Sequence, residues 1–177
     1  MTPPAPLILA STSPHRRLLL ERLGLPFSTE NPGVDEAVVG SEPPRERAMR
    51  LAMQKAQAVS DRRPDALVIG GDQVACTGST LLEKPGDPAR ARAQLARLSG
   101  TVALFHTACA VICRESAFSA AHVDSTGAVF RQLAPAEIER YVSRDQPLDC
   151  AGSFKAEALG ISLLERIEGI DPTSLIG

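Results

Sequence analysis

Three hydroxyl groups and two guanidinium groups follow the first apolar run of the chain. Ser11-Thr12-Ser13 comes directly after Leu7–Ala10, Pro14 stands where a helix would begin, and Arg16 and Arg17 lie in its first turn. A helix N-terminus presents free backbone N–H groups, so these groups together suit a phosphate chain. The same residues also fit an ordinary capped helix, with Ser13 as the N-cap and Pro14 at the first helical position. This segment alone leaves both interpretations open.

Two acidic residues could serve the hydrolysis of a phosphate bond. Asp72 follows a short apolar run at Ala66–Gly70, where it could activate a water molecule or help to hold Mg²⁺. The structural alternative is a turn aspartate that bonds its own backbone. Glu36 lies in a loop rich in turn-forming residues, where it could be a metal ligand or simply solvated.

Two lysines could place point charges against phosphate. Lys84 precedes Pro85 and Gly86, which would form a stiff turn that aims its ammonium group. Lys55 lies within an expected helix, and its neighbours in the sequence are mostly small or apolar. The alternative for both residues is an ordinary solvated surface lysine.

A glycine-punctuated segment carries a candidate for base recognition. Gly152 and Gly160 bracket Lys155 and Glu157, and glycines let a backbone approach a ligand closely. The carboxylate of Glu157 could accept hydrogen bonds from the N1–H and the exocyclic amine of a guanine. The alternative is a glycine-punctuated loop that binds nothing.

Hydrophobic periodicity places these candidates between alternating strands and helices. Strands are expected at 7–10, 27–30, 66–70, 102–113 and 122–131, and helices at 14–23, 44–60, 87–99 and 135–142. Residues 161–167 could form a late strand or a short helix. This mixture along the whole length predicts a single α/β domain over residues 1–177 with a mixed β-sheet.

The same patterns predict buried faces and turns. The first helix should bury Leu18, Leu19, Leu20 and Leu23, and the second should bury Ala48, Leu51, Ala52 and Ala56. The strand before Asp72 should end at a Gly71-Asp72-Gln73 loop, and residues 76–84 should form a hairpin that turns at Gly78-Ser79. Ligands on such sheets bind at the carboxyl ends of strands, so Ser11–Arg17 and Gly70–Gln73 are expected to lie together.

Composition argues against several function classes. The formal net charge is −2, and the chain has one tyrosine and no tryptophan, so neither bulk charge nor aromatic platforms favour nucleic-acid binding. No apolar stretch is long enough to span a membrane, and the N-terminus does not resemble a signal peptide. The four cysteines form no CxxC pair, which fits free thiols in a reducing cytoplasm.

Several separated motifs, taken in order, resemble those of the Maf family of nucleoside triphosphate pyrophosphatases. The motifs are Leu9-Ala-Ser-Thr-Ser-Pro-His-Arg-Arg17, Val34-Asp-Glu36, Lys55-Ala-Gln57, Gly71-Asp-Gln73 and Glu83-Lys-Pro85. Cys150-Ala-Gly-Ser-Phe-Lys-Ala-Glu157 is similar to the branch that acts on 7-methylguanosine triphosphate. The branch that acts on dTTP and UTP has an Asp-Lys-Ala-Gly-Gly-Tyr type of segment there, which this chain lacks.

The resemblance implies a fold, an activity and a location. It implies two lobes around an elongated mixed sheet flanked by helices, with a cleft for nucleotide. The implied reaction cleaves between the α and β phosphates of a nucleoside triphosphate, with a divalent metal such as Mg²⁺ or Mn²⁺ as cofactor. The implied location is the cytoplasm, without a nucleic-acid or membrane partner, and a homodimer is compatible with the chain.

The resemblance also implies a role for each matching residue. Asp72 matches the proton acceptor, and the polar site residues match Ser11, Arg16, Glu36, Lys55 and Lys84. The positions linked to base choice are His15, Gln73 and Glu157. The chemistry of a triphosphate then assigns Arg16, Lys55 and Lys84 to the phosphates, with Ser11 and Ser13 in support. A metal would bridge phosphate oxygens and a carboxylate, either Glu36 or Asp72.

Two departures from the family pattern bear on these expectations. Position 15 is often an aromatic ring such as tryptophan, whose face could attract cationic N7-methylguanine, whereas this chain has His15. The chain ends at Gly177, and family members usually continue with a final helix. The alternatives that stay open are a pyrophosphatase for dTTP, UTP or CTP, and a regulator of cell division that binds nucleotide without cleaving it.

Overall fold

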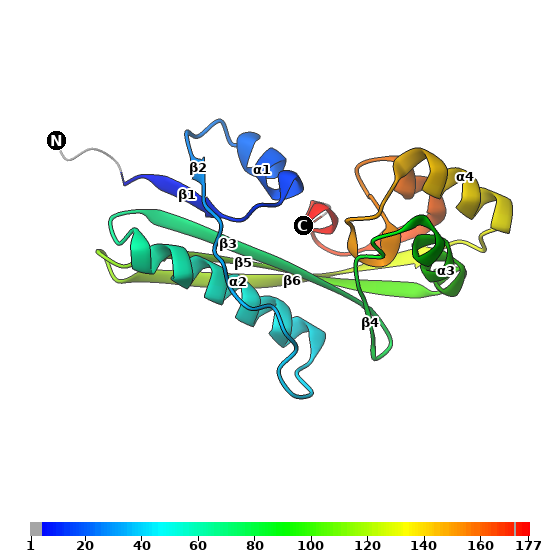
Figure 1. The fold of residues 1–177 in the computed structure, drawn as a ribbon, viewed down its shortest axis with the longest axis horizontal. Helices are drawn as coiled ribbons and strands as arrows, with labels where there is room; N and C mark the ends of the chain where they lie inside the picture. Colours follow the sequence, from blue (N-terminus) through cyan, green and yellow to red (C-terminus); the bar gives the residue numbers. More distant parts are fainter. Residues whose placement is uncertain (1–4, 172) are drawn as a thin grey trace. The chain divides into compact units, whose positions relative to one another are not determined.

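Apolar runs of the sequence form one mixed sheet in the computed structural model, which describes residues 5–171 and 173–177 (Figure 1). The strands are β1 (Leu7–Ala10), β2 (Ser28–Thr29), β3 (Leu67–Thr77), β4 (Thr80–Leu82), β5 (Val102–Cys113), β6 (Phe118–Phe130) and β7 (Leu164–Glu168). Their order is β2-β1-β3-β5-β6-β7, with β4 paired to β3. β1 is parallel to both β2 and β3, whereas β4 and β7 pair antiparallel with β3 and β6.

Four α-helices accompany these strands in the described ranges. They are α1 (Pro14–Glu21), α2 (Pro44–Arg62), α3 (Pro88–Leu98) and α4 (Pro135–Asp145), and short 3₁₀ helices lie at Ala151–Ser153, Leu159–Leu163 and Ser174–Ile176. The mixed α/β class and the hairpin at Gly78-Ser79 are therefore confirmed. The late segment, for which helix and strand were both expected, contains both: a 3₁₀ turn runs directly into β7.

The chain divides into two compact units. The first unit contains residues up to 73 together with 107–123 and 177, and the second contains residues 74–106 and 124–176. The candidate residues from Ser11 to Gln73 therefore belong to the first unit, whereas Lys84 and Glu157 belong to the second.

Close packing between α2 and β3 organises the first unit. The predicted buried face of α2 is confirmed, since Ala48, Leu51, Ala52 and Ala56 are all buried. A Cβ atom on Gly70 would lie 2.3 Å from the carbonyl oxygen of Ala52, so the glycine lets the helix backbone approach the strand. Successive strand residues face opposite sides, and Arg16 of α1 lies against the other side at Gly71. Helices α1 and α2 thus cover opposite faces here (Figure 1).

The predicted inner face of α1 is partly wrong. Leu20 is buried, but Leu18 is 59% exposed and Leu23 is 64% exposed. The helix has only eight residues, ending at Glu21, so it has room for one narrow contact stripe. That stripe holds Arg16 and Leu20, which are four residues apart and therefore share a face. The run of leucines predicted an apolar inner face, but that face also carries the cationic side chain of Arg16.

The predicted end of the strand before Asp72 is also wrong. β3 continues through Gly71, Asp72 and Gln73 to Thr77, so these three residues are strand residues and do not form a loop. The two glycines, which resemble a turn signal, instead leave room for α2 on one face and for Arg16 on the other. The expected meeting of the two segments is confirmed, because Ala10 at the end of β1 pairs with Gly70.

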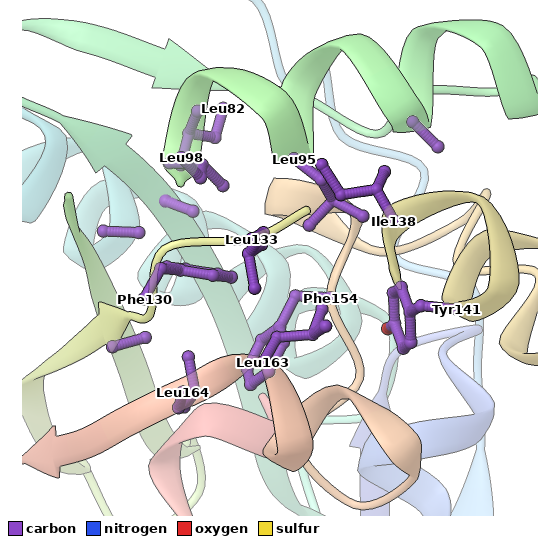
Figure 2. Close-up of a cluster of buried hydrophobic side chains, with 14 of the residues drawn as sticks. Leu82, Leu95, Leu98, Phe130, Leu133, Ile138, Tyr141, Phe154, Leu163 and Leu164 are labelled. Carbon is purple, nitrogen blue, oxygen red and sulfur yellow. The ribbon is translucent and has the colours of Figure 1, made fainter. Parts of the chain in front are cut away.

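A hydrophobic core fills the second unit (Figure 2). The ring of Phe154 packs against Phe105 and Phe130, with centroid distances of 6.1 and 5.7 Å. Leu95 and Leu98 of α3 and Ile138 and Tyr141 of α4 join this core, as Figure 2 shows. The segment that leads to Glu157 is therefore anchored by a buried aromatic side chain, although it has little regular structure of its own.

Substitution of Gly70 tests the close approach of α2 to β3. Gly70→Ala should lower the free energy of unfolding by roughly 1–3 kcal/mol, because overpacking forces the backbone to shift. Chemical denaturation measures this loss. Gly127→Ala is the matched control, since that strand glycine would place its Cβ at an ordinary 3.4 Å from its nearest neighbour, Glu168 Cβ. Equal losses in the two variants would contradict the packing described here.

Candidate functional site

The ammonium group of Lys55 joins two carboxylates in the first unit. Lys55 Nζ lies 2.6 Å from Asp72 Oδ1 and 2.7 Å from Glu36 Oε1. The side chains of Lys55 and Asp72 are only 6% and 8% exposed, whereas that of Glu36 is 59% exposed. The three residues come from α2, the loop before it and β3. One cation therefore holds a buried and an exposed carboxylate at the same point.

The buried face of α2 explains the position of Lys55. The residue lies four positions after Leu51 and three after Ala52, so its side chain leaves the helix on the same face. The alternative of a solvated surface lysine is wrong for Lys55. Because a buried ammonium group requires an opposite charge, Asp72 is its natural partner across the packed interface.

Burial raises the pKa of Asp72 above its ordinary value, and the cations of Lys55 and Arg16 oppose this rise. The turn-aspartate alternative is excluded, because Asp72 lies inside β3 and its side chain pairs with Lys55. A carboxylate in this setting is a better base than one in water, since its proton affinity is higher.

Two arginines of α2 tether the loop that carries Glu36. Arg47 Nη2 donates to the carbonyl oxygen of Glu36 at 3.0 Å, and Arg50 Nη2 donates to that of Ala37 at 3.2 Å. Arg50 also pairs with Glu42, and its hydrogen bond lowers the pKa of the Glu42 carboxyl to about 2. These contacts between loop and helix fix the loop backbone next to Lys55.

Hydroxyl groups order the turn between β1 and α1. Ser13 caps α1 by accepting a hydrogen bond from the backbone N–H of Arg16, and its own N–H donates to Ser11 Oγ at 3.1 Å. The predicted N-cap is confirmed. Ser11 is buried at the end of β1. The turn therefore holds two hydroxyl oxygens and the first backbone N–H groups of α1 in one place.

The guanidinium of Arg16 is a shielded cation beside Gly71. Among the described residues it makes no hydrogen bond or ion pair, although its δ-carbon and ε-nitrogen lie 3.3 Å from where a Cβ of Gly71 would stand. Burial lowers the pKa of Arg16, and the charges of Asp72 and Glu36 oppose that shift. A shielded guanidinium with donors to spare is suited to an anion such as phosphate.

The two remaining first-unit candidates flank this group. Gln73 follows Asp72 in β3, and its Nε2 donates to Thr107 Oγ1 at 3.0 Å. His15 is half-buried in α1, next to Arg16 in the sequence. All the sequence-predicted residues up to Gln73 therefore belong to the same compact unit and come from β1, α1, α2, β3 and the loop at Glu36.

Lys84 lies in the second unit, in the turn between β4 and α3. Its exposed side chain lines an open hollow of about 280 Å³ together with Arg90 and Arg97 of α3. Gly86 adopts a φ of +75°, which favours glycine, and its N–H donates to Leu148 O at 3.0 Å. The predicted stiff turn is thus present, and three cations surround the hollow.

Glu157 is exposed in the second unit, on a segment fixed by its neighbours. The backbone N–H of Lys155 donates to the hydroxyl of Tyr141 at 3.0 Å, and Lys155 Nζ donates to the carbonyl oxygen of Asp145 at 3.0 Å. A Cβ on Gly160 would lie 2.4 Å from the carbonyl oxygen of Lys155. Lys155 thus anchors the segment to the end of α4, and Glu157 is the carboxylate that it presents.

Sequence patterns missed several residues that shape the group of Lys55, Asp72, Glu36 and Arg16. Arg47 and Arg50 carry no motif that distinguishes them from solvated helix arginines. Gly71 resembled a turn residue, but it makes room for Arg16. Cys109 of β5 interacts electrostatically with Arg16, which opposes the rise that burial causes in the pKa of this thiol. No local signal in the sequence predicts that contact, because the two residues are far apart in the chain.

The donor set of the first unit suits a hard divalent cation. One oxygen each of Glu36 and Asp72 lies within 2.7 Å of the same nitrogen, so the two carboxylates already converge. Carboxylate oxygens are the ligands that Mg²⁺ and Mn²⁺ prefer, and the side chain of Glu36 is mostly exposed. None of the helices in residues 5–171 and 173–177 combines the length and the apolar character that a membrane span requires.

Comparisons with known proteins identify a family and named relatives. The family model described as Maf-like protein matches residues 6–177. A 7-methyl-GTP pyrophosphatase of Aromatoleum aromaticum is 52% identical over 97% of this chain and 88% of its own length. Proteins of the same name from a Polaromonas species and from Xanthomonas oryzae pv. oryzae are 50% and 52% identical over 97% of this chain, and 78% and 89% of their own lengths are covered.

Removal of Lys55 tests the buried ion pair. Lys55→Met should lower the free energy of unfolding by up to about 3 kcal/mol, because Asp72 loses its bonded cation. The same substitution made in an Asp72→Asn background should cost much less, since no buried charge is left unpaired. Chemical denaturation of the four proteins in this cycle gives the coupling. Equal losses in both backgrounds would contradict the pairing.

Proposed function

Because the chain belongs to the Maf family, we propose that it hydrolyses 7-methyl-GTP between the α and β phosphates, giving 7-methyl-GMP and pyrophosphate. The observation that carries this proposal is a buried carboxylate, Asp72, on a rigid strand, where it is paired with Lys55 and interacts with the charge of Arg16. The names of the relatives at about 50% identity support the choice of nucleotide.

Cationic and hydroxyl groups are proposed to bind the phosphates. A nucleoside triphosphate carries about four negative charges, so its hydrolysis depends mainly on positioning and charge neutralisation. Arg16 has unused donors for this role, and the turn at Ser11 and Ser13 adds the N-terminal N–H groups of α1. Lys84 is proposed to add a further point charge from the second unit.

Asp72 is proposed to act as the general base. Its carboxylate would take a proton from a water molecule, whose oxygen then attacks the α phosphorus while the bond to the leaving pyrophosphate breaks. Lys55 holds the carboxylate in a single orientation through Oδ1, which leaves Oδ2 to accept the proton. Strand β3 supplies the rigidity, because Asp72 is fixed within a continuous ladder.

A divalent metal is proposed as the cofactor, held by Glu36 and Asp72. When bound, such an ion would neutralise charge on the phosphate oxygens as a Lewis acid. The arginine tethers of the loop keep Glu36 beside Asp72, and Lys55 keeps the two carboxylates from repelling each other when no ion is bound.

Base choice is proposed to depend on His15, Gln73 and Glu157. The exposed carboxylate of Glu157 suits the N1–H and amine edge of a guanine, which a pyrimidine does not offer. A neutral imidazole at position 15 would attract cationic 7-methylguanine less than an indole would. Discrimination therefore rests mainly on Glu157.

Replacement of the base tests this mechanism. Asp72→Asn should reduce kcat for 7-methyl-GTP about 10²–10⁴-fold with KM changed little, because the base is lost while the cationic groups remain. Pyrophosphate release in the presence of Mg²⁺ or Mn²⁺ measures turnover, and circular dichroism checks that the variant is folded. Near-normal turnover of the folded variant would contradict the assignment.

A substrate panel in the same assay tests the nucleotide. The wild-type protein should prefer 7-methyl-GTP over dTTP, UTP and CTP. A preference for pyrimidines would retain the reaction but remove the role proposed for Glu157. Tight nucleotide binding without turnover would instead favour a regulator that binds nucleotide and does not cleave it.

A further inference from the structure

The turn that carries Lys84 is held at its backbone. The carbonyl oxygen of Glu83, just before Lys84, accepts a hydrogen bond from Gln94 Nε2 at 3.2 Å. The N–H of Gly86, just after it, donates to Leu148 O at 3.0 Å. Lys84 itself makes no bond to another side chain in the part of the chain that the structure describes. The backbone point from which its side chain extends is therefore fixed on either side.

Gln94 of α3 has a second bond at the other end of its amide. Ser153 Oγ donates to Gln94 Oε1 at 2.6 Å. Both halves of one planar amide are thus used, one on the Lys84 turn and the other on the segment that leads to Glu157. Two segments about 70 residues apart in the sequence are joined by a single half-buried side chain.

The Ser153 end of this bridge is rigid. Ser153 is fully buried and has a φ of +55°, which a non-glycine residue adopts only when its surroundings enforce it. Beside it, Gly152 has a φ of +73° and lies against the ring of Phe105. Phe154 follows in the hydrophobic core, and Lys155 is anchored to α4. A bond to Ser153 is therefore a bond to a fixed point.

We propose that Gln94 is a positioning residue, which couples the Lys84 turn to the Ser153–Glu157 segment so that the phosphate-binding and base-binding groups of the second unit keep one spacing. This inference rests on the proposed function, because the distance between Lys84 and Glu157 matters only if both residues bind the same nucleotide. Gln94 touches neither substrate nor metal in this account.

The chemistry of the bridge requires an amide. The Ser153 hydroxyl needs an acceptor and the Glu83 carbonyl needs a donor, and glutamine is the residue of this length that offers both. Glutamate at position 94 could accept from Ser153 but would present an oxygen to the Glu83 carbonyl. Leucine has a similar volume and would remove both bonds.

Steady-state kinetics of Gln94→Leu test this coupling. The variant should lose about three- to thirty-fold in kcat/KM for 7-methyl-GTP, mostly through a higher KM, since one or two net hydrogen bonds are at stake. Its preference for 7-methyl-GTP over UTP should also fall, because Glu157 no longer keeps its place relative to Lys84. Gln94→Glu should show an intermediate loss.

Three further variants keep the test decisive. Ser153→Ala removes only one bond and should reproduce part of the loss, and the double variant with Gln94→Leu should lose no more than Gln94→Leu alone. Arg92→Ala is the matched control on α3. It breaks an exposed ion pair with Glu139 3.4 Å away and should leave KM and base preference unchanged.

The outcomes separate this inference from the proposed function. If the wild-type protein cleaves no nucleotide, the proposed function fails and the coupling fails with it. If the wild-type protein is active and folded Gln94→Leu has the KM and base preference of Arg92→Ala, the coupling alone is overturned. A fall in melting temperature with unchanged KM would assign Gln94 a purely structural role and would also overturn it.

Discussion

The ion pair between Lys55 and Asp72 is the constraint on which the first unit depends. An ionised carboxylate inside a strand is costly unless a cation reaches it, and the cation must come from an element packed directly on that strand. Helix α2 can approach so closely only because its inner face is alanine-rich and β3 has Gly70 opposite it. The ion pair and the close approach of α2 to β3 therefore depend on the same packing.

The same pair explains how charges of both signs stay close together. The charges of both Lys55 and Arg16 act on Asp72, and Glu36 approaches Lys55 from the loop before α2. In the part of the chain that the structure describes, the guanidinium of Arg16 makes no hydrogen bond or ion pair, although the charge of Asp72 acts on it. Under the proposed function, the anion would bind these groups without rearranging them first, which is how preorganised charge stabilises a phosphoryl transition state.

How far the sequence predicts this site depends on the range of the interaction. Short-range signals succeed: the Ser13 cap, the buried face of α2 and the hairpin at Gly78-Ser79 follow from local patterns. The continuation of β3 through Gly71-Asp72-Gln73 does not, because two glycines that allow close packing resemble two glycines that make a turn. Contacts such as Arg47 with the Glu36 loop, or Gln94 with Ser153, join distant segments and leave no periodic signal.

The position of the bond that breaks tests the central claim most directly. Hydrolysis of 7-methyl-GTP in ¹⁸O-labelled water, followed by mass spectrometry of both products, shows which phosphorus the water attacks. A water activated by Asp72 and directed to the α phosphorus puts the label in 7-methyl-GMP and none in pyrophosphate. Label in pyrophosphate, or release of orthophosphate with a diphosphate, would contradict the account.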